Sequence, residues 1–480
     1  MDESAVRTPA EHFEVLVIGA GQGGGPLAGA FVRAGRRVAL VERIHVGGTC
    51  VNEGCSPTKT VIASARVAHL ARRASEYGVD AGSRGEVVVD LARVHDRKQR
   101  IVDSFRGGSE RSLAAAGVEL VRGQACFVAP RTVRVAPEGG DSDDARTIAA
   151  DVVVINTGLR SAIPPLDGLD AVPYLTSTSI LELTERPEHL IVLGGGYVGL
   201  EFAQAFRRFG SRVTVVQRGA QLLPREDADV AEAVTEILRD DGIAVHCGAE
   251  AVRVEGRTGD VRLTWRSRDG GAEQVIAGSH LLVATGRTPN TDDLALDAAG
   301  VETDARGYVP VNGRLETSAA GVYAIGDVKG GPAFTHISYD DFRVLRTNLL
   351  EGGSATTDGR IVPYTVFIDP QLGAVGMSER AARASGRRVR VAKLPMTSVA
   401  RALEVDETRG FMKAVVDADT HEILGATVLG LEGGEVATLF QVAMMGRLPY
   451  TALRDGVFSH PTLAEALNNL FTAMDREGSA

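Results

Sequence analysis

The stretch VLVIGAGQGGGPLAGAFVRAGRRVALVE, residues 15–42, places the glycine pattern GxGxxG between two short apolar runs. The first run has the length of a buried strand, and the residues after the glycines have the apolar spacing of a helix. Glycines at such a turn let backbone N–H groups and the positive end of the helix approach a pyrophosphate. At the end of the second run, the Glu42 carboxylate can accept hydrogen bonds from a ribose 2′-OH. The stretch therefore predicts a dinucleotide site built on Gly19, Gly21, Gly24 and Glu42.

A second stretch of the same build, LIVLGGGYVGLEFAQAFRRFGSRVTVVQ, covers residues 190–217 and repeats the pattern at Gly194, Gly196 and Gly199. Gln217 follows Gly194 by 23 residues, the same offset that separates Glu42 from Gly19. The pattern alone is a weak signal in a chain with 56 glycines, but each copy follows an apolar strand and opens a helix. The repeat predicts two nucleotide-binding units in one chain.

The two units differ at the residue that would meet the ribose. The second unit has Gln217 and Arg218 where an acid is expected for NAD. A neutral amide does not repel a 2′-phosphate, and a neighbouring arginine can pair with one. We therefore expect NADPH, in preference to NADH, at the second unit.

Short apolar runs alternate with helical stretches along most of the chain, which predicts an α/β fold with parallel sheets. The expected strands include residues 14–18, 37–41, 151–156, 189–193, 212–216 and 280–284. From about residue 362 the pattern changes to paired strands, FMKAVVD and EILGATVLG, followed by a helix over 435–445, so a separate C-terminal α+β domain is expected. Residues 138–144 are expected to form a solvated loop, and the first twelve and last four residues to be frayed.

Composition excludes several classes of protein. The net charge of −10 leaves no basic surplus for contacts with nucleic acid. No apolar run approaches the ~20 residues that a membrane span needs. The opening MDESAVRTPAEHF is polar and unlike a signal peptide, so the cytoplasm is the expected location.

The segment GGTCVNEGCSPTK, residues 47–59, holds two of the four cysteines five positions apart. Gly54 permits a turn between Cys50 and Cys55, and a thiol at the start of a helix gains thiolate character. Half of a zinc site is the alternative, but no further Cys or His stands at matching spacing, so we expect no metal. The pair predicts a redox-active disulfide, while Cys126 and Cys247 are expected to be buried apolar residues.

Two further positions have chemistry suited to a thiol. Lys59, one of only five lysines, follows Cys55 by four residues and therefore lies on the same helix face. Near the C-terminus, SHPTLAE at 459–465 predicts a helix entry with Pro461 in its first turn. Glu465 can there reach back to the His460 imidazole, and such a pair can act as general acid and base toward a leaving thiolate.

Together these segments resemble the class I pyridine nucleotide–disulfide oxidoreductase family over nearly the whole chain, with ATGRTPN at 284–290, VYAIGDV at 322–328 and HPTLAE at 460–465 as further matches. That family includes dihydrolipoamide dehydrogenase, glutathione reductase and mercuric reductase. The resemblance implies two Rossmann-like domains: an FAD-binding domain over 1–160 with a central second part over 287–358, and an NAD(P)-binding domain over 161–286. It also implies a dimerisation domain over 359–480 and a homodimer in which His460 serves the partner's site.

The same resemblance implies roles for single residues. Asp327 would bind the ribityl chain of FAD, Tyr197 would shield the flavin until the nicotinamide arrives, and Glu201 would pair with Lys59. The remaining FAD contacts would be Gly48, Thr49, Lys59, Ala125, Thr157, Gly158, Phe334, Thr335 and His336, and the remaining NAD(P) contacts Val198, Val252 and Gly286. Hydride would pass from NAD(P)H through FAD to the disulfide, with Cys55 next to the flavin and Cys50 attacking the substrate.

Resemblance within the family favours one substrate class. Segments 281–291 and 294–301 are similar to mercuric reductase, but the ending LNNLFTAMDREGSA lacks that enzyme's cysteine pair, and His460 is retained. Segments 332–345, 362–367 and 448–471 resemble bacterial flavoproteins of reactive-chlorine defence, which reduce hypothiocyanous acid. A small oxidised sulfur or reactive-chlorine-derived substrate is therefore expected. Dihydrolipoamide dehydrogenase, mercuric reductase and a redox-sensing flavoprotein without turnover are the alternatives.

Overall fold

The computed structural model describes residues 10–80, 87–137 and 144–477, which form two compact units. The first unit contains residues up to 60, 96–162 and 287–360, and the second contains 61–95, 163–286 and 361 onward. Helices α3 (Cys55–Arg72) and α4 (Leu91–Ala116) include the positions at which the chain passes from one unit to the other. None of the helices in the described ranges is long and apolar enough to cross a bilayer.

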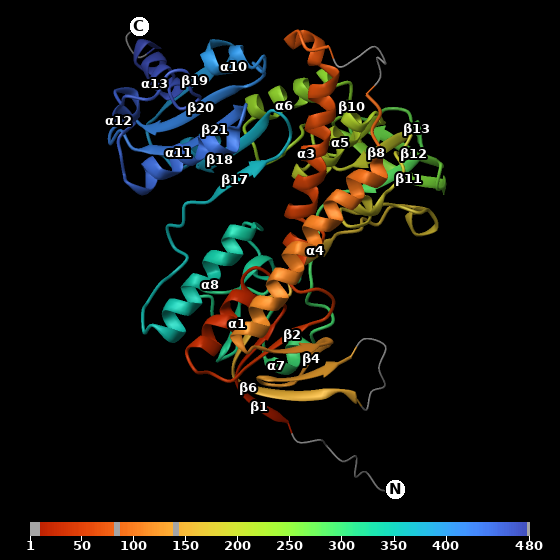
Figure 1. Cartoon of the computed structure of the whole chain (residues 1–480), viewed down its shortest axis with the longest axis vertical. Helices are drawn as coiled ribbons and strands as arrows, with labels where there is room; N and C mark the ends of the chain where they lie inside the picture. The colour runs from red at the N-terminus through yellow and green to blue at the C-terminus, as the bar shows by residue number, and fades with distance from the viewer. Residues whose placement is uncertain (1–9, 81–86, 138–143, 478–480) are drawn as a thin grey trace. The chain divides into compact units, whose positions relative to one another are not determined.

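The first unit is built on a seven-stranded sheet whose parallel part has the order β3-β2-β1-β6-β16. Its strands are β1 (Glu11–Ile18), β2 (Val38–Glu42), β3 (Glu119–Arg122), β4 (Gln124–Ala129), β5 (Thr132–Ala136), β6 (Arg146–Ile155) and β16 (Val322–Ala324). Strands β4 and β5 extend it in antiparallel fashion. Helices α1 (Gly24–Arg33) and α8 (Thr335–Leu350) pack against each other, and α1 also packs on β1 and β2 (Figure 1). The register pairs Ile18 with both Val41 and Ile155, so three parallel strands end at one edge.

The second unit contains a four-stranded parallel sheet of the order β10-β9-β8-β14. Its strands are β8 (His189–Leu193), β9 (Arg212–Val216), β10 (Ala244–His246) and β14 (His280–Val283), with helices α5 (Tyr197–Phe209) and α6 (Ala228–Asp240). A three-stranded antiparallel sheet of β11 (Ala249–Arg257), β12 (Asp260–Ser267) and β13 (Gln274–Gly278) belongs to the same unit. Leu193 pairs with Val216 and with Val283, which repeats the edge arrangement of the first unit.

The second unit also contains a five-stranded antiparallel sheet of the order β17-β18-β21-β20-β19. Its elements are β17 (Pro363–Val366), β18 (Gln371–Gly376), α9 (Glu379–Ala384), β19 (Val389–Pro395), α10 (Ala400–Glu404), β20 (Phe411–Asp417), β21 (Ile423–Gly430), α11 (Gly433–Met445), α12 (Tyr450–Arg454) and α13 (Ala466–Glu477). Helix α11 packs on β18 and β21, and α13 packs on β19 (Figure 1). Phe440 of α11 and Phe471 of α13 are fully buried in one core cluster, 6.2 Å apart between ring centroids.

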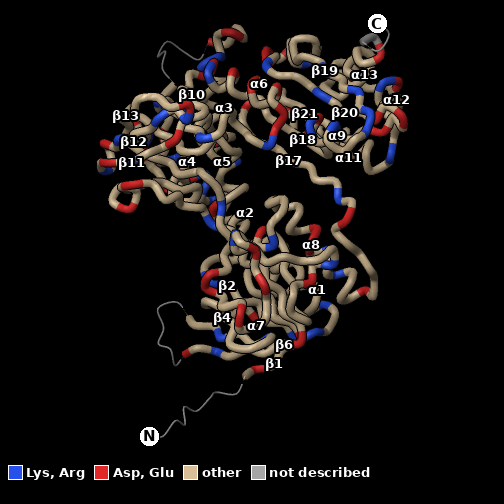
Figure 2. The backbone as a smooth tube through the Cα atoms, turned by 180° about the vertical axis from the view of Figure 1, so that it is seen from behind, with Lys and Arg blue, Asp and Glu red and all other residues tan. Residues whose placement is uncertain are grey.

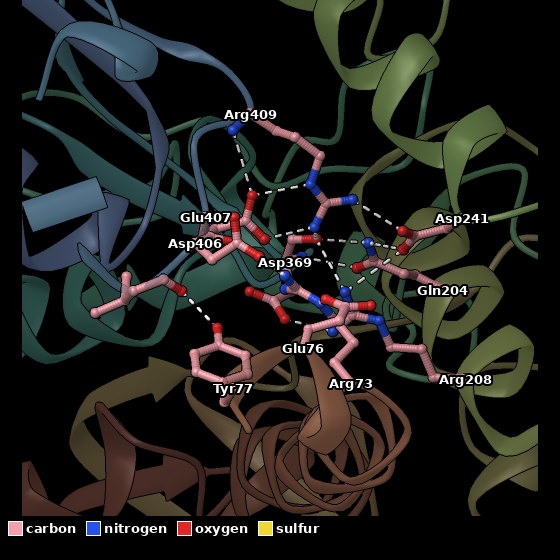
Figure 3. A network of polar contacts seen from close by, with 11 residues as sticks. Arg73, Glu76, Tyr77, Gln204, Arg208, Asp241, Asp369, Asp406, Glu407 and Arg409 are labelled. Atoms are coloured by element: carbon pink, nitrogen blue, oxygen red, sulfur yellow. Dashed lines mark hydrogen bonds and ion pairs between the residues drawn. The ribbon is translucent and has the colours of Figure 1, made fainter. Parts of the chain in front are cut away.

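A polar network joins helix α5, the end of α6 and the five-stranded sheet within the second unit (Figure 3). Arg208 of α5 forms ion pairs with Asp369 and Asp241, and Arg409 reaches Asp241 at 2.9 Å. Gln204 donates 2.8 Å hydrogen bonds to the Asp241 carboxylate and to the Asp369 carbonyl. Elsewhere, charged residues of both signs are interspersed along the described chain (Figure 2).

The α/β fold class with two dinucleotide-binding sheets and a C-terminal α+β part is confirmed. Three local expectations are wrong. Residues 11 and 12 belong to β1 and pair with β6, so they are not frayed. Helix α13 begins at 466 rather than at Pro461, because the Thr462 hydroxyl bonds the Ser459 carbonyl at 2.7 Å and closes a turn there. Cys126 and Cys247 are only partly buried.

Residues 1–9, 138–143 and 478–480 lie outside the described residues, and with them most of the expected loop and termini. The division into FAD-binding, NAD(P)-binding, central and dimerisation domains stays a prediction. Four further short elements belong to the first unit: α2 (Gly48–Asn52), α7 (Leu296–Ala299), and the paired strands β7 (Leu159–Ser161) and β15 (Arg287–Pro289).

Candidate active site

Cys50 and Cys55, both in the first unit, are neighbours and are present as thiols. Cys50 lies in α2, Cys55 is the first residue of α3, and the Cys55 thiol is close enough to be the largest influence on the pKa of Cys50. Gly54 makes this approach possible, because a Cβ there would lie 2.7 Å from the Thr49 carbonyl oxygen. Thr335 Oγ1, at the start of α8, is 3.5 Å from Cys55 Sγ. The two thiols are thus neighbours, which is the first requirement of a reversible disulfide.

The pKa of Cys50 is raised rather than lowered in this dithiol form. Its hydrogen bond to Cys55 raises the pKa most, followed by burial of the thiol. The expectation that thiols at a helix start gain thiolate character is therefore wrong for Cys50: it lies in the first turn of α2, but the neighbouring Cys55 thiol and burial raise its pKa. Cys50 needs a base to become a nucleophile at neutral pH.

The predicted glycine turn of the first unit is formed by close backbone contacts. Gly19 has φ +104°, and a Cβ there would lie 2.4 Å from the Asn156 carbonyl oxygen. A Cβ at Gly24 would lie 2.2 Å from the carbonyl oxygen of Gly19, and one at Gly21 would lie 2.9 Å from Asn156 Nδ2. Glu42 accepts hydrogen bonds from the Ala20 and Ile44 N–H groups, both at 2.9 Å. Strand β1, strand β2 and Asn156 therefore meet at one narrow turn.

The second unit repeats this turn. Gly194 has φ +114°, and a Cβ there would lie 2.3 Å from the Ala284 carbonyl oxygen. A Cβ at Gly199 would lie 2.3 Å from the Gly194 oxygen, whereas one at Gly196 would meet no protein atom within 4 Å. Gln217 Oε1 accepts the Gly195 N–H at 2.9 Å. Arg218 is exposed, and its Nε is 3.9 Å from Glu250 Oε1.

The other residues expected at the second site, and Glu201, which was expected to pair with Lys59, lie on several elements of the same unit. Tyr197 and Val198 open α5, and Glu201, one turn further, is buried and accepts the Phe367 N–H at 2.8 Å. Val252 lies at the irregularity of β11, where the register shifts between residues 251 and 253. Gly286 has φ +154° and follows β14.

His460 and Glu465 form the pair that their spacing predicts. The His460 imidazole is exposed, and its Nδ1 lies 2.8 and 3.1 Å from the two Glu465 carboxylate oxygens. A carboxylate bound at Nδ1 orients the ring and leaves Nε2 as the nitrogen that can exchange a proton with a substrate or thiol. The geometry suits a general acid–base pair.

Residues 13–341 match the family described as "Pyridine nucleotide-disulphide oxidoreductase", and residues 362–471 match the "dimerisation domain" of that family. The chain belongs to the pyridine nucleotide–disulphide oxidoreductase family. "Probable pyridine nucleotide-disulfide oxidoreductase RclA" of Escherichia coli (strain K12) is 38% identical to this oxidoreductase over 466 residues, which are 96% of this chain and 99% of that protein. The solved structure "HOCl-induced flavoprotein disulfide reductase RclA from Escherichia coli" matches with a TM-score of 0.85 and 37% identity, covering 96% of this chain and 99% of that one.

Other relatives of the oxidoreductase have different names. A "Mercuric reductase" of Bacillus cereus is 35% identical and covers 97% of this chain and 72% of that protein. A "Dihydrolipoyl dehydrogenase" of Haloferax volcanii is 36% identical and covers 95% of this chain and 94% of that protein. The oxidoreductase is thus a flavoprotein disulfide reductase of the class that contains RclA, mercuric reductases and dihydrolipoyl dehydrogenases. Its family implies FAD and a nicotinamide coenzyme, and the dimerisation domain indicates a homodimer.

The first unit of the oxidoreductase fits FAD at three independent points. The glycine turn is too narrow for side chains at Gly19 and Gly24. The Thr157 hydroxyl is buried without a hydrogen-bond partner. Burial raises the pKa of Asp327, whose carboxylate has no hydrogen-bond partner among the described residues. A ligand with hydroxyl donors would satisfy both polar groups.

The remaining residues predicted for the FAD site all lie in the first unit. The Phe334 and His336 rings stack with centroids 5.4 Å apart, and the residue between them in sequence, Thr335, has its hydroxyl 3.5 Å from Cys55 Sγ. The others are Gly48, with φ +62° and close to Gly21, Thr49 in α2, Lys59 in α3, Ala125 in β4 and Gly158, with φ +69°. The roles of all these residues, and the pairing of Lys59 with Glu201, stay predictions.

Three residues of the oxidoreductase contact a glycine turn or its neighbours, although no sequence pattern predicted a role for them. Asn156 donates from Nδ2 to the Gly19 carbonyl at 3.1 Å and stabilises the first glycine turn. Its signal is an amide directly after the apolar run VVVI. Glu226 and Tyr364 contact Tyr197 beside the second turn. No spacing rule connects Glu226 with Tyr364, because their contact spans 138 positions.

Proposed function

We propose that this oxidoreductase uses NADPH to reduce a Cys50–Cys55 disulfide and then reduces a small oxidised sulfur or reactive-chlorine-derived substrate with the resulting dithiol. The observation that carries the proposal is the contact between the two thiols in the unit that holds the FAD-fitting turn. Bound FAD supplies the carrier that takes a hydride from the coenzyme and passes an electron pair to the disulfide.

The chain's own residues would divide the work of the second half-reaction. Cys55, at the first position of α3 and near Thr335, is suited to remain next to the flavin. Cys50, as a thiolate, would attack the substrate, and the resulting mixed species would be resolved by Cys55. His460, oriented by Glu465 and acting from the partner subunit, would take the thiol proton and return it to the leaving group.

The reaction balances with hypothiocyanous acid as the oxidant. Cys50 takes the sulfur of hypothiocyanous acid and releases water, forming a sulfur–sulfur bond to the thiocyanate group. Cys55 then displaces thiocyanate, which restores the disulfide and releases one proton. One NADPH supplies the two electrons for each cycle. The chemical class of the substrate is supported by the similarity to RclA, whose structure is described as HOCl-induced.

Coenzyme choice is supported by the end of β9. Gln217 presents no charge to a 2′-phosphate, and the Arg218 guanidinium is exposed with a carboxylate no closer than 3.9 Å. A 2′-phosphate there would gain a charge-assisted contact that NADH cannot make.

A panel of oxidants tests the proposed function on the purified holoenzyme. NADPH oxidation is followed with hypothiocyanous acid, low-molecular-weight disulfides, lipoamide and Hg(II), in the wild type and in Cys50→Ser and Cys55→Ser. We expect turnover with hypothiocyanous acid or a small disulfide, and its loss in both variants. Turnover with lipoamide and NADH alone would show that the protein is a lipoamide dehydrogenase and that the proposed substrate class is wrong. Flavin reduction without turnover of any oxidant would indicate a redox sensor.

A further inference from the structure

Two tyrosine hydroxyls converge on one buried carboxylate beside the second glycine turn. Tyr197, the first residue of α5, donates to Glu226 Oε1 at 2.8 Å. The Tyr364 hydroxyl, on β17, lies 2.8 and 2.9 Å from the two Glu226 carboxylate oxygens. Glu226 is 3% exposed, so water does not compete for this carboxylate. Each hydrogen bond to it is charge-assisted.

The tyrosine rings also contact each other. The rings of Tyr197 and Tyr364 stack with centroids 5.6 Å apart and an angle of 22° between their planes. The Arg225 guanidinium carbon lies 5.8 Å from the Tyr197 ring centroid. Burial, and after it the charge of Glu226, raises the pKa of both tyrosines, so both hydroxyls remain protonated donors near neutral pH.

Hydrogen bonds and an ion pair fix the chain segment that carries Glu226. The Glu226 N–H bonds the Leu223 carbonyl at 2.9 Å. The next residue, Asp227, accepts the N–H groups of Glu379 and Arg380 at 2.9 and 3.1 Å and the Lys413 ammonium at 3.0 Å. The support for Tyr197 is therefore anchored to the five-stranded sheet and its helix α9.

Position alone places Tyr197 on the path of a coenzyme. It follows Gly196, where a Cβ would meet no protein atom, and it begins the helix whose N-terminus would receive the pyrophosphate. A coenzyme that moves the Tyr197 ring must break the bond to Glu226 and the stack on Tyr364. Tyr364 would then still donate its one hydroxyl proton to the carboxylate, which keeps the buried charge hydrogen-bonded.

We propose that Glu226 and Tyr364 are positioning residues for Tyr197: they hold its ring beside the second glycine turn, and Tyr364 stays on Glu226 when the nicotinamide coenzyme moves Tyr197. The inference rests on the proposed function, because it takes the second glycine turn as the coenzyme site. The free energy needed to break the contact between Tyr197 and Glu226 is subtracted from the binding free energy of the coenzyme. The contact therefore lowers the apparent affinity, since only the displaced conformation binds.

Two single-atom deletions give opposite predictions. Tyr197→Phe removes the bond that must break but keeps the ring, so the holoenzyme should bind NADP⁺ about threefold to tenfold more tightly. Tyr364→Phe removes the donor that remains, so displacing Tyr197 would leave a buried carboxylate unsatisfied. That variant should bind NADP⁺ about tenfold more weakly. In Tyr364→Phe the limiting rate of flavin reduction at saturating NADPH should stay within about twofold of the wild type, because this hydroxyl does not enter the chemical step.

The experiment is a titration of the holoenzyme with NADP⁺, followed by the flavin absorbance, and stopped-flow reduction by NADPH. Tyr77→Phe is the matched control, because it deletes a tyrosine hydroxyl bonded at 2.6 Å to the Val405 carbonyl in the same unit. It should leave the affinity unchanged. Equal NADP⁺ affinity in the wild type and in Tyr197→Phe, or a change of the same sign in Tyr197→Phe and Tyr364→Phe, would overturn the inference. If NADPH fails to reduce the wild-type flavin at all, the proposed function fails instead.

Discussion

Gln217 Oε1 accepts the Gly195 N–H at 2.9 Å, in the same way that a Glu42 oxygen accepts the Ala20 N–H in the other unit. The two side chains thus stabilise equivalent glycine turns, although one is charged and the other is neutral. The Gln217 amide makes the same structural hydrogen bond as the Glu42 carboxylate. Because it does so without a negative charge, it does not repel a phosphate on the coenzyme. Glutamine at this position is therefore compatible with a stable turn and with a 2′-phosphate nearby.

Changing this amide to an acid should switch the coenzyme. Gln217→Glu keeps the acceptor for Gly195 but brings a negative charge toward a 2′-phosphate, so kcat/KM with NADPH should fall by about tenfold or more while that with NADH rises. Arg218→Ala should lower only the NADPH value, by about tenfold. Arg212→Ala is the control, since this exposed residue begins the same strand at its other end. Steady-state rates with both coenzymes measure all three. An unchanged NADPH-to-NADH ratio in Gln217→Glu would contradict the assignment.

The raised pKa of Cys50 predicts a strongly pH-dependent reactivity of the reduced enzyme. The hydrogen bond to Cys55 and burial favour the neutral thiol, so alkylation of Cys50 by iodoacetamide should be slow at pH 7 and accelerate as the pH rises. In Cys55→Ala the neighbouring thiol is absent, and the same acceleration should begin at a lower pH. Anaerobic alkylation followed by mass spectrometry of the Cys50 peptide measures both profiles. A wild-type rate that does not vary between pH 7 and 9 would contradict the shift.

Sequence patterns were sufficient where neighbouring residues determine the structure. The predicted bounds of β8, β9 and β20 match the observed ones, because each is an apolar run between polar or glycine breakers. The contact of His460 with Glu465 was predictable for the same reason, as both residues lie in one turn. The Glu226 cluster was not predictable, because its donors come from α5 and β17 and meet only through tertiary packing. The helix start predicted at Pro461 was wrong, because a turn closed by the Thr462 hydroxyl precedes the helix.

A buried lysine should make the second unit sensitive to acid. Lys413, 4% exposed at its side chain, pairs with Asp227, Asp229 and Glu379 at 2.9 to 3.0 Å. Burial alone would raise the pKa of Asp227, but the Arg380 N–H and the Lys413 ammonium hold it below its usual range. Lys413 lowers the pKa of Glu379 in the same way, against burial, and the pKa of Asp229 is lowered first by Lys393 and then by Lys413.

These lowered pKa values determine how the free energy of unfolding depends on pH. Their stabilising effect is complete above the unfolded-state pKa of about 4 and is lost as the pH falls through the lower folded-state values. Lys413→Met should therefore destabilise the protein most near neutral pH, and its difference from the wild type should shrink below about pH 4. Urea midpoints between pH 3 and 8 measure this. Lys393→Met, which removes a half-exposed partner of Asp229, should have a small effect throughout. A Lys413→Met deficit that is constant over this pH range would exclude the linkage.

The polar network in Figure 3 offers a direct comparison of a buried and an exposed ion pair. Asp369→Asn removes the charge that faces Arg208, whose side chain is 6% exposed and whose next carboxylate, on Asp241, is 3.5 Å away. Because the arginine would keep its buried charge with one weak partner, we expect a loss of about 3 kcal/mol. Asp406→Asn removes the charge paired with Arg73 in the same network, but Asp406 is 64% exposed, so the loss should stay below about 1 kcal/mol. Urea denaturation monitored by circular dichroism compares the two variants. Equal midpoints would mean that burial does not set the strength of this network, because both substitutions delete one carboxylate charge and preserve the shape of the side chain.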